Sequence, residues 1–147
     1  MCKVDIYIKA SNRTIRRCNR TIMYLMAYLT SVGTTVTYPS VDRLRESIIE
    51  TTGSWIESEA EILARALGCL NRPCNITVHT ECAQLKTVLD RWIPGWKAKG
   101  WIKTDGTQVQ EVYRSLEEAM QTHKITVTQE HHEYDSWMET QLKGEKK

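Results

Sequence analysis

The stretch "WIPGWKAKGWIKTDG" (residues 92–106) places three tryptophans and three lysines within fifteen residues. Because a segment that leaves the body of a small domain has no core of its own, its indoles must pack together while its lysines stay solvated. Lysines on such a projection bind phosphate through charge, without reading base sequence. The segment 92–106, called the handle below, is therefore a candidate basic patch, with these tryptophans and lysines: Trp92, Trp96, Trp101, Lys97, Lys99 and Lys103. The alternative is that the tryptophans are simply buried and the lysines form an ordinary solvated face.

The composition of the whole chain indicates one globular domain. The chain has 147 residues, of which 41% are hydrophobic and 26% charged, a balance that excludes disordered and fibrous classes. Twenty Lys and Arg against eighteen Asp and Glu give a net charge of only +2, so any nucleic-acid surface must be a local patch. Besides the handle, "RTIRRCNR" (13–20) is a candidate patch. We expect one domain over 1–142 and a charged tail over 143–147.

The apolar runs and the cysteines indicate a cytoplasmic protein. The longest apolar run, "IMYLMAYL" (22–29), has eight residues, whereas a bilayer span needs about twenty. The opening "MCKVDIYIKAS" lacks the layout of a signal peptide. Five cysteines, odd in number and without a C-x-x-C pair, favour reduced thiols over a disulfide framework or a zinc site. We expect a monomer with no membrane partner.

The first third of the chain has strand patterns. Apolar and polar residues alternate in "KVDIYIKAS" (3–11), which predicts a strand. "TIMYLMAYLT" (21–30) and "TTVTYPS" (34–40) complete an antiparallel meander in the simplest interpretation, and a helix is the alternative for 21–30. Residues 41–57 have no clear pattern.

The rest of the chain alternates helices and strands. "SEAE" is a capping box with Ser58 as N-cap and Glu61 three residues on, which opens a helix that ends before Pro73. Further helices are expected at 81–93, stopped by Pro94-Gly95, at 110–123 and at 134–142, and strands at 74–80 and 124–129. A meander followed by this order indicates a mixed α/β fold with a right-handed crossover.

The handle belongs to a longer pattern, "TECAQLKTVLDRWIPGWKAKGWIKTDGTQVQEVYRSL" (80–116). Its Trp, Ile, Lys and Gly spacing, W-I-x-x-W-K-x-x-G-W, resembles the protruding basic handle of type 1 ribonucleases H. The resemblance implies that the tryptophans and lysines of the handle are nucleic-acid-binding residues. "EILARALGCL" (61–70) and "VDIYIKAS" (4–11) resemble the first helix and first strand of that family, and "EHH" and "SWM" resemble a divergent bacterial branch with a degenerate active site. The resemblance implies a ribonuclease H-like α/β fold, with a mixed five-stranded sheet of an antiparallel meander plus parallel crossover strands, flanking helices and a protruding basic handle.

The resemblance also implies a chemistry. Ribonucleases H hydrolyse the RNA strand of an RNA–DNA hybrid with two divalent ions, so Mg²⁺ or Mn²⁺ is the expected cofactor if this protein is active. Glu61 occupies the family's carboxylate position on the first helix, and Glu81 the position after the fourth strand. Each also has an ordinary interpretation, Glu61 as a capping residue or a partner of Arg65, and Glu81 as a solvated residue in a first helical turn.

The C-terminal site residues are implied by "TQEHHEYDSWMETQL" (128–142), which resembles the family's last helix and the segment before it. Asp135 is the expected carboxylate there, with Glu139 and Glu133 as alternatives. His132, or its neighbour His131, corresponds to the histidine that helps release product. The implied metal ligands are Glu61, Glu81 and Asp135.

The first strand departs from the family. In the register of "IYIKAS" against I-Y-T-D-G-S, Lys9 replaces the metal-bridging aspartate. An ammonium about 4 Å from a divalent ion would oppose its binding by roughly 8 kcal/mol at an effective dielectric of about 20. Asp5 lies about 13 Å back along the strand and is too far away to substitute.

Three functions are compatible with these patterns: an active ribonuclease H, a binder that does not cut because Lys9 replaces the charge of a metal, and a protein-interaction module. We expect a ribonuclease H-like protein that binds RNA–DNA hybrid or duplex nucleic acid, with metal-dependent hydrolysis of the RNA strand impaired by the loss of the first-strand carboxylate. The alternative is a catalytically inactive protein-interaction module on the same scaffold.

Overall fold

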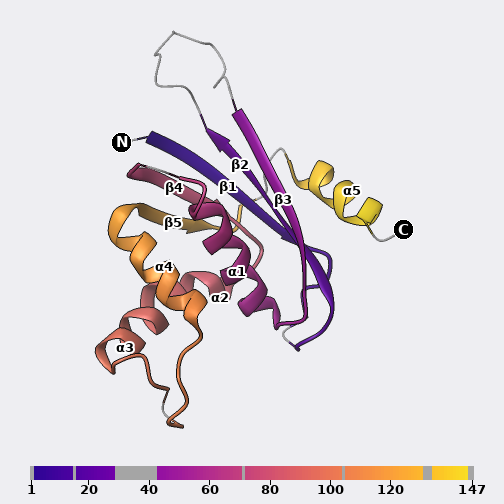
Figure 1. Cartoon of the computed structure of the whole chain (residues 1–147). Helices are drawn as coiled ribbons and strands as arrows, with labels where there is room; N and C mark the ends of the chain where they lie inside the picture. Colours follow the sequence, from indigo (N-terminus) through magenta and orange to yellow (C-terminus); the bar gives the residue numbers. More distant parts are fainter. Residues whose placement is uncertain are drawn as a thin grey trace.

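The structure is a computed structural model that describes residues 2–14, 16–28, 43–70, 72–103, 105–130 and 134–145. Within these residues five strands form one sheet in the order β3-β2-β1-β4-β5 (Figure 1). Strands β1, β2 and β3 pair antiparallel, whereas β4 pairs parallel with β1 and with β5. The predicted mixed five-stranded sheet is confirmed. The strands are β1 (Cys2–Ala10), β2 (Arg20–Tyr28), β3 (Arg43–Thr51), β4 (Cys74–His79) and β5 (Lys124–Thr128).

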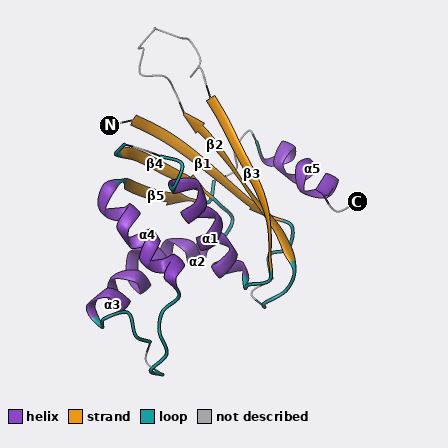
Figure 2. Cartoon of the chain, in the orientation of Figure 1, coloured by secondary structure: helices purple, strands orange, loops and turns teal. Residues whose placement is uncertain are grey.

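The two faces of the sheet are both covered by helices (Figure 2). Helices α1 (Trp55–Leu67) and α4 (Glu111–Thr122) pack on one face, and α5 (Asp135–Glu145) packs on the other. Strand β2 therefore buries both of its sides, Ile22, Tyr24 and Met26 toward the first face and Met23 and Leu25 toward α5. A strand buried on both faces has a continuous apolar sequence instead of an alternating one, which explains why 21–30 was also compatible with a helix.

The third strand of the meander is β3, Arg43–Thr51. It lies within 41–57, where the sequence gave no clear pattern. The predicted third strand, 34–40, lies outside the described residues. Strand β3 pairs with β2 along its full length, from Thr51 opposite Arg20 to Arg43 opposite Tyr28.

Helix α1 begins earlier than predicted, and the assignment of Ser58 as its N-cap is wrong. The N-cap is Ser54, whose Oγ accepts from the backbone N of Glu57 at 3.2 Å, while Glu57 Oε1 accepts from the backbone N of Ser54 at 3.4 Å. Ser58 is buried inside the helix, where its hydroxyl donates to the carbonyl of Ser54 at 2.8 Å. The sequence contains two consecutive S-x-x-E boxes, at 54–57 and 58–61. The earlier box adds Trp55 and Ile56 to the helix, and both pack against the core.

The chain between β4 and α4 forms consecutive helical segments: α2 (Ala83–Thr87), the π-helical turn η1 (Val88–Trp92) and α3 (Ile93–Ala98). The predicted stop at Pro94-Gly95 is wrong. Pro94 lies in the first turn of α3, where a missing backbone N–H is tolerated. The helical path ends instead at Ala98, and beyond its C-cap Lys99 the chain turns away at Gly100 and Trp101, whose φ angles of 71° and 66° are positive.

The remaining elements lie close to their predicted positions. β4, α4, β5 and α5 begin or end within three residues of the predicted bounds. Helix α5 runs to Glu145, and the division into a domain over 1–142 and a tail over 143–147 stays a prediction. No helix in the described part of the chain is long and apolar enough to cross a membrane.

Candidate functional site

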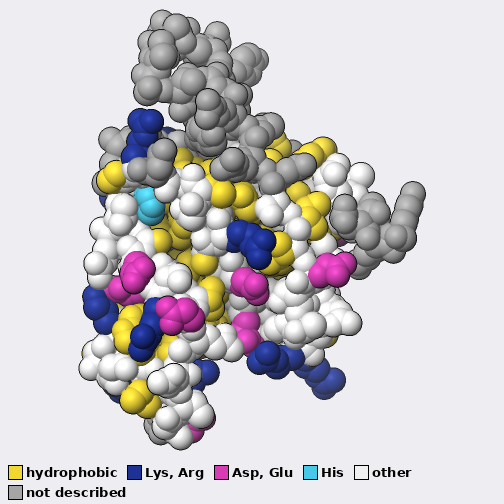
Figure 3. Space-filling view, viewed as in Figure 1, with side chains coloured by type: hydrophobic (Ala, Val, Ile, Leu, Met, Phe, Trp, Pro, Cys, Tyr) yellow, Lys and Arg dark blue, Asp and Glu magenta, His cyan; other side chains and the backbone are white. Residues whose placement is uncertain are grey.

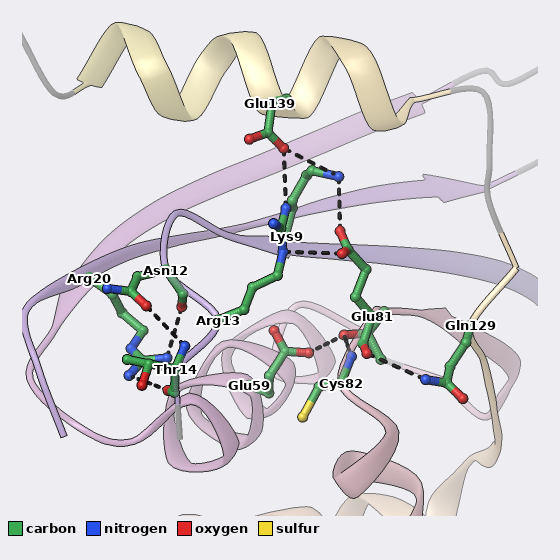
Figure 4. A network of polar contacts seen from close by, with 11 residues as sticks. Lys9, Asn12, Arg13, Thr14, Arg20, Glu59, Glu81, Cys82, Gln129 and Glu139 are labelled. Atoms are coloured by element: carbon green, nitrogen blue, oxygen red, sulfur yellow. Dashed lines mark hydrogen bonds and ion pairs between the residues drawn. The ribbon is translucent and has the colours of Figure 1, made fainter. Parts of the chain in front are cut away.

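Lys9 lies near the end of β1, on the face that α5 covers, and is only 8% exposed. Because the parallel register pairs Tyr7 with His79, Lys9 and Glu81 lie side by side two residues further along. Lys9 Nζ is 3.1 Å from Glu81 Oε1 and 3.5 Å from Glu139 Oε2 of α5 (Figure 4). The ends of β1 and β4 and the middle of α5 thus meet at one edge of the sheet.

Arg13, in the connection between β1 and β2, is a second cation in this cluster. Its Nε is 3.1 Å from Glu81 Oε2 and its Nη2 is 3.3 Å from Glu139 Oε2. Lys9, Arg13, Glu81 and Glu139 form a network in which each cation contacts both carboxylates (Figure 4). We call these residues the four-charge cluster. The formal charges of its members sum to zero.

Two other arginines of the predicted basic patch 13–20 are also engaged by the protein. Arg20 is 3% exposed, and its guanidinium donates to the carbonyls of Asn12, Thr14 and Arg16 at 2.8–3.0 Å. Arg17 pairs with Glu57 of α1 at 3.3 Å. Arg13, Arg17 and Arg20 therefore hold the β1–β2 connection in place, whereas Arg16 is exposed.

Helix α1 places Glu59 at the same end of the sheet as the four-charge cluster, whereas Glu61 is exposed. Glu59 is 1% exposed and accepts a hydrogen bond from Thr80, the residue before Glu81. Burial raises the pKa of Glu59 to about 7, against the opposing effect of the Thr80 hydroxyl. Glu59 shares the buried stripe of the helix with Ile62 and Leu63, three and four residues on. That spacing was the sequence signal for Glu59.

The C-terminal candidates are described in part. His131, His132 and Glu133 lie outside the described residues. Asp135 is the first residue of α5, and its side chain is not described. Glu139, four residues later, is the C-terminal carboxylate that the structure brings to Lys9.

This set of side chains does not fit a two-metal centre. Among the described residues, no three His, Cys, Asp or Glu side chains are arranged to hold a metal ion. Lys9 Nζ lies between Glu81 and Glu139 and satisfies the negative charge that a divalent ion would need. Magnesium needs several free oxygen ligands, and here both carboxylates are engaged by Lys9 and Arg13.

The tryptophans of the handle connect it to α4. The ring of Trp96 lies 5.0 Å from that of Tyr113 and 5.9 Å from that of Trp92, measured between centroids. The Arg114 guanidinium lies 5.5 Å above Trp101, a cation–π contact. The indoles thus provide packing to a segment with little core of its own.

The lysines of the handle differ in their surroundings. Lys97 Nζ is 2.6 Å from Glu117 Oε1 of α4, and this hydrogen bond lowers the pKa of Glu117. Lys99 is exposed and Lys103 half-exposed. Figure 3 shows acidic and basic side chains intermingled over the region of α3 and α4. The basic surface of the handle is therefore partly neutralised, and Lys99 and Lys103 are its more available charges.

Comparison with known proteins relates about half of the chain to bacterial ribonucleases H. It is 38% identical over 80 residues to a ribonuclease H of Agrobacterium fabrum, which covers 53% of each protein. It is 41% identical over 78 residues to a ribonuclease H of Hyphomonas neptunium, which covers 52% of this chain and 51% of the relative. The match spans about half the length of these curated relatives. No family model matches the chain.

Solved structures extend the similarity to the whole fold. A type 1 RNase H with the type 2 active-site motif matches 97% of this chain and 73% of its own, with a TM-score of 0.66 at 16% identity. The PFV RNase H domain matches 99% of this chain and 88% of its own, with a TM-score of 0.55 at 14% identity. The chain is therefore an α/β protein with the ribonuclease H fold. In sequence, about half of the chain is similar to bacterial ribonucleases H.

Proposed function

We propose that this protein binds RNA–DNA hybrid or duplex nucleic acid and that its hydrolysis of the RNA strand is impaired. The observation that carries this proposal is the position of Lys9 Nζ, 3.1 Å from Glu81 and 3.5 Å from Glu139. A buried ammonium occupies the space between the carboxylates that ribonucleases H use for divalent ions. The expected cytoplasmic location and monomeric state stay predictions.

The binding half of the proposal is supported by the handle and by the relatives. Lys99 and Lys103 are the more available lysines on a segment held to α4 by indole packing. Such a segment presents charge to a phosphate backbone without sequence preference. A foamy viral protease-reverse transcriptase solved in complex with RNA/DNA hybrid has a similar fold, with a TM-score of 0.57 at 8% identity over 96% of this chain and 19% of that one.

The cluster also has a direct electrostatic role in binding. Without cations, Glu81 and Glu139 would repel an approaching phosphate, because like charges at short range are unfavourable. Lys9 and Arg13 neutralise both carboxylates within the protein. These four residues therefore add no net negative charge to the surface that a nucleic-acid backbone would meet, and we expect binding that requires no divalent ion.

Cleavage and binding assays on native protein and a Lys9→Asp variant test the proposal. Native protein should bind labelled hybrid without cutting it in Mg²⁺ or Mn²⁺, and Lys9→Asp should gain metal-dependent cleavage, because it restores a carboxylate and removes the ammonium. Lys3→Asp, on the same strand but exposed, is the matched control and should gain nothing. Efficient cleavage by native protein would overturn the proposed impairment, and failure to bind any nucleic acid at low salt would overturn the proposed binding.

One observation favours the alternative function, a protein-interaction module. Trp137 of α5 is 41% exposed, and exposed indoles are common in protein interfaces. A module of this kind would show no salt-sensitive affinity for hybrid, so the binding assay above separates the two functions.

A further inference from the structure

Glu57, in the first turn of α1, joins three segments that are distant in the sequence. Its carboxylate accepts from Arg17 Nη1 at 3.3 and 3.4 Å and from Gln110 Nε2 at 2.8 Å. It also accepts from the backbone N of Ser54 at 3.4 Å, the capping contact. Of the bonds that the Glu57 carboxylate accepts, a capping box needs only the one from the backbone N of Ser54. The bonds from Arg17 and Gln110 therefore require another explanation.

The two partners outside α1 belong to segments next to the candidate site. Arg17 lies in the β1–β2 connection, which also carries Arg13 of the four-charge cluster. Gln110 is the N-cap of α4 and follows Val109, whose backbone N donates to the carbonyl of Trp101 in the handle at 2.9 Å. Glu57 is therefore the point at which the β1–β2 connection and the base of the handle meet.

The ionised form of Glu57 is the one that suits this role. Burial acts to raise its pKa, but hydrogen bonds from Gln110 and Ser54 and the charge of Arg17 outweigh burial, so that the pKa is lowered. A carboxylate accepts with both oxygens, and such charge-assisted bonds are stronger than neutral ones. A backbone bond from Cys18 N to the carbonyl of Gly53, at 3.4 Å, adds a second link between the β1–β2 connection and the start of α1.

We propose that Glu57 is a positioning residue that fixes the β1–β2 connection relative to the handle, so that nucleic acid binds both segments as one surface. This inference rests on the proposed function. It predicts that Arg17 and Gln110, which lie on different segments, act cooperatively in binding through the carboxylate that they share.

The substitution Glu57→Gln separates positioning from capping. Glutamine keeps one carbonyl oxygen, which still accepts from Ser54, because Gln serves in capping boxes as well as Glu. Its NH₂ group takes the place of Oε2, is a donor and cannot accept from Gln110, while the retained oxygen, still within reach of Arg17, no longer carries the negative charge that pairs with the guanidinium. Glu111→Gln, an exposed change in the first turn of α4, is the control for the loss of one negative charge.

Amide hydrogen exchange and hybrid affinity are measured on native protein and both variants. In Glu57→Gln, amide hydrogen exchange at residues 16–18 and 107–110 should accelerate at least tenfold, while the exchange rates in the middle of α1 stay unchanged. The affinity for hybrid should fall about five- to twentyfold. In a double-mutant cycle, Arg17→Ala and Gln110→Ala should be coupled in the native background and additive in Glu57→Gln. Glu111→Gln should resemble native protein.

The inference is overturned if Glu57→Gln leaves exchange in both segments unchanged, or if the native protein binds hybrid and Glu57→Gln binds it equally well. Faster exchange confined to the first turn of α1 would reduce Glu57 to a capping residue and would also overturn it. If the native protein binds no nucleic acid, the proposed function fails, and the exchange data alone then decide whether Glu57 joins the two segments.

Discussion

Lys9 and Glu59 are both buried ionisable side chains at the same end of the sheet, but their partners differ. Lys9 contacts two carboxylates, Glu81 and Glu139, and a buried charge is tolerated when it is paired in this way. Glu59 is bonded to the neutral hydroxyl of Thr80, and burial raises its pKa to about 7. Lys9 is therefore part of a compensated network, whereas the carboxylate form of Glu59 is costly.

Glu59→Gln should make the stability of the protein less dependent on pH. The pKa of Glu59 is raised from 4.5 to about 7 in the folded state, so the contribution of its protonated form is complete below pH 4.5 and is lost as the pH rises to about 7. Glutamine does not titrate and still accepts from Thr80. The native protein should lose roughly 3 kcal/mol of unfolding free energy between acidic and neutral pH, at about 1.4 kcal/mol per unit of pKa. The variant should not show this loss. Urea unfolding at pH 4 and pH 8 measures this difference, and an equal effect at both pH values would contradict it.

At the residue scale, sequence patterns located Lys9 better than they located the carboxylate of α1. The alternating pattern of β1 predicted that Lys9 lies on one face of a strand. The alignment of "IYIKAS" with the family motif predicted that Lys9 lies in the same site as Glu81. The resemblance of "EILARALGCL" (61–70) to the family's first helix implies Glu61, whereas the carboxylate that α1 buries beside Thr80 is Glu59, two residues earlier. Arg13 was not assigned to the site, because its contacts with Glu81 and Glu139 depend on the path of a connection that has no periodic pattern.

At the scale of elements, the handle depends on packing against α4 more than on its own helical propensity. Its short helix α3 follows a π-helical turn and ends at Ala98, and two residues with positive φ, Gly100 and Trp101, follow its C-cap. Trp96 supplies the main contact through Tyr113 and is partly buried against the core. The sequence predicted the indole packing correctly, but it did not predict that the helical path continues through Pro94.

Trp96→Ala should detach the handle from α4. Removing the indole loses its contacts with Tyr113 and Trp92. Because Trp96 is only partly buried, we expect a loss of about 3 kcal/mol of unfolding free energy, at the low end of the roughly 3–5 kcal/mol of large aromatic truncations in a core. Hybrid affinity should fall as well, because Lys99 and Lys103 lose their fixed position. Chemical denaturation measures the first effect and fluorescence anisotropy the second.

Trp137→Ala is the matched control, because this tryptophan is exposed on α5, on the opposite face of the sheet. Its loss should cost less than about 1 kcal/mol, as surface substitutions usually do. Equal destabilisation by the two substitutions would show that Trp96 has no special part in attaching the handle.

At the scale of the whole molecule, the sheet order brings distant segments to one edge. β1 is central and parallel to β4, so the ends of both strands meet, and α5 crosses above them. This topology could be predicted from the order of elements and the family motif. The third strand could not, because 41–57 lacks the alternation of a half-buried strand.

The central claim is that the cations of the protein occupy the position of the family's divalent ions. It is tested most directly by Mn²⁺ titration of native protein and Lys9→Asp, followed by electron paramagnetic resonance of free Mn²⁺. We predict no saturable binding to the native protein at millimolar Mn²⁺ and stoichiometric binding to Lys9→Asp. Saturable binding to the native protein that disappears in Glu81→Gln would contradict the claim.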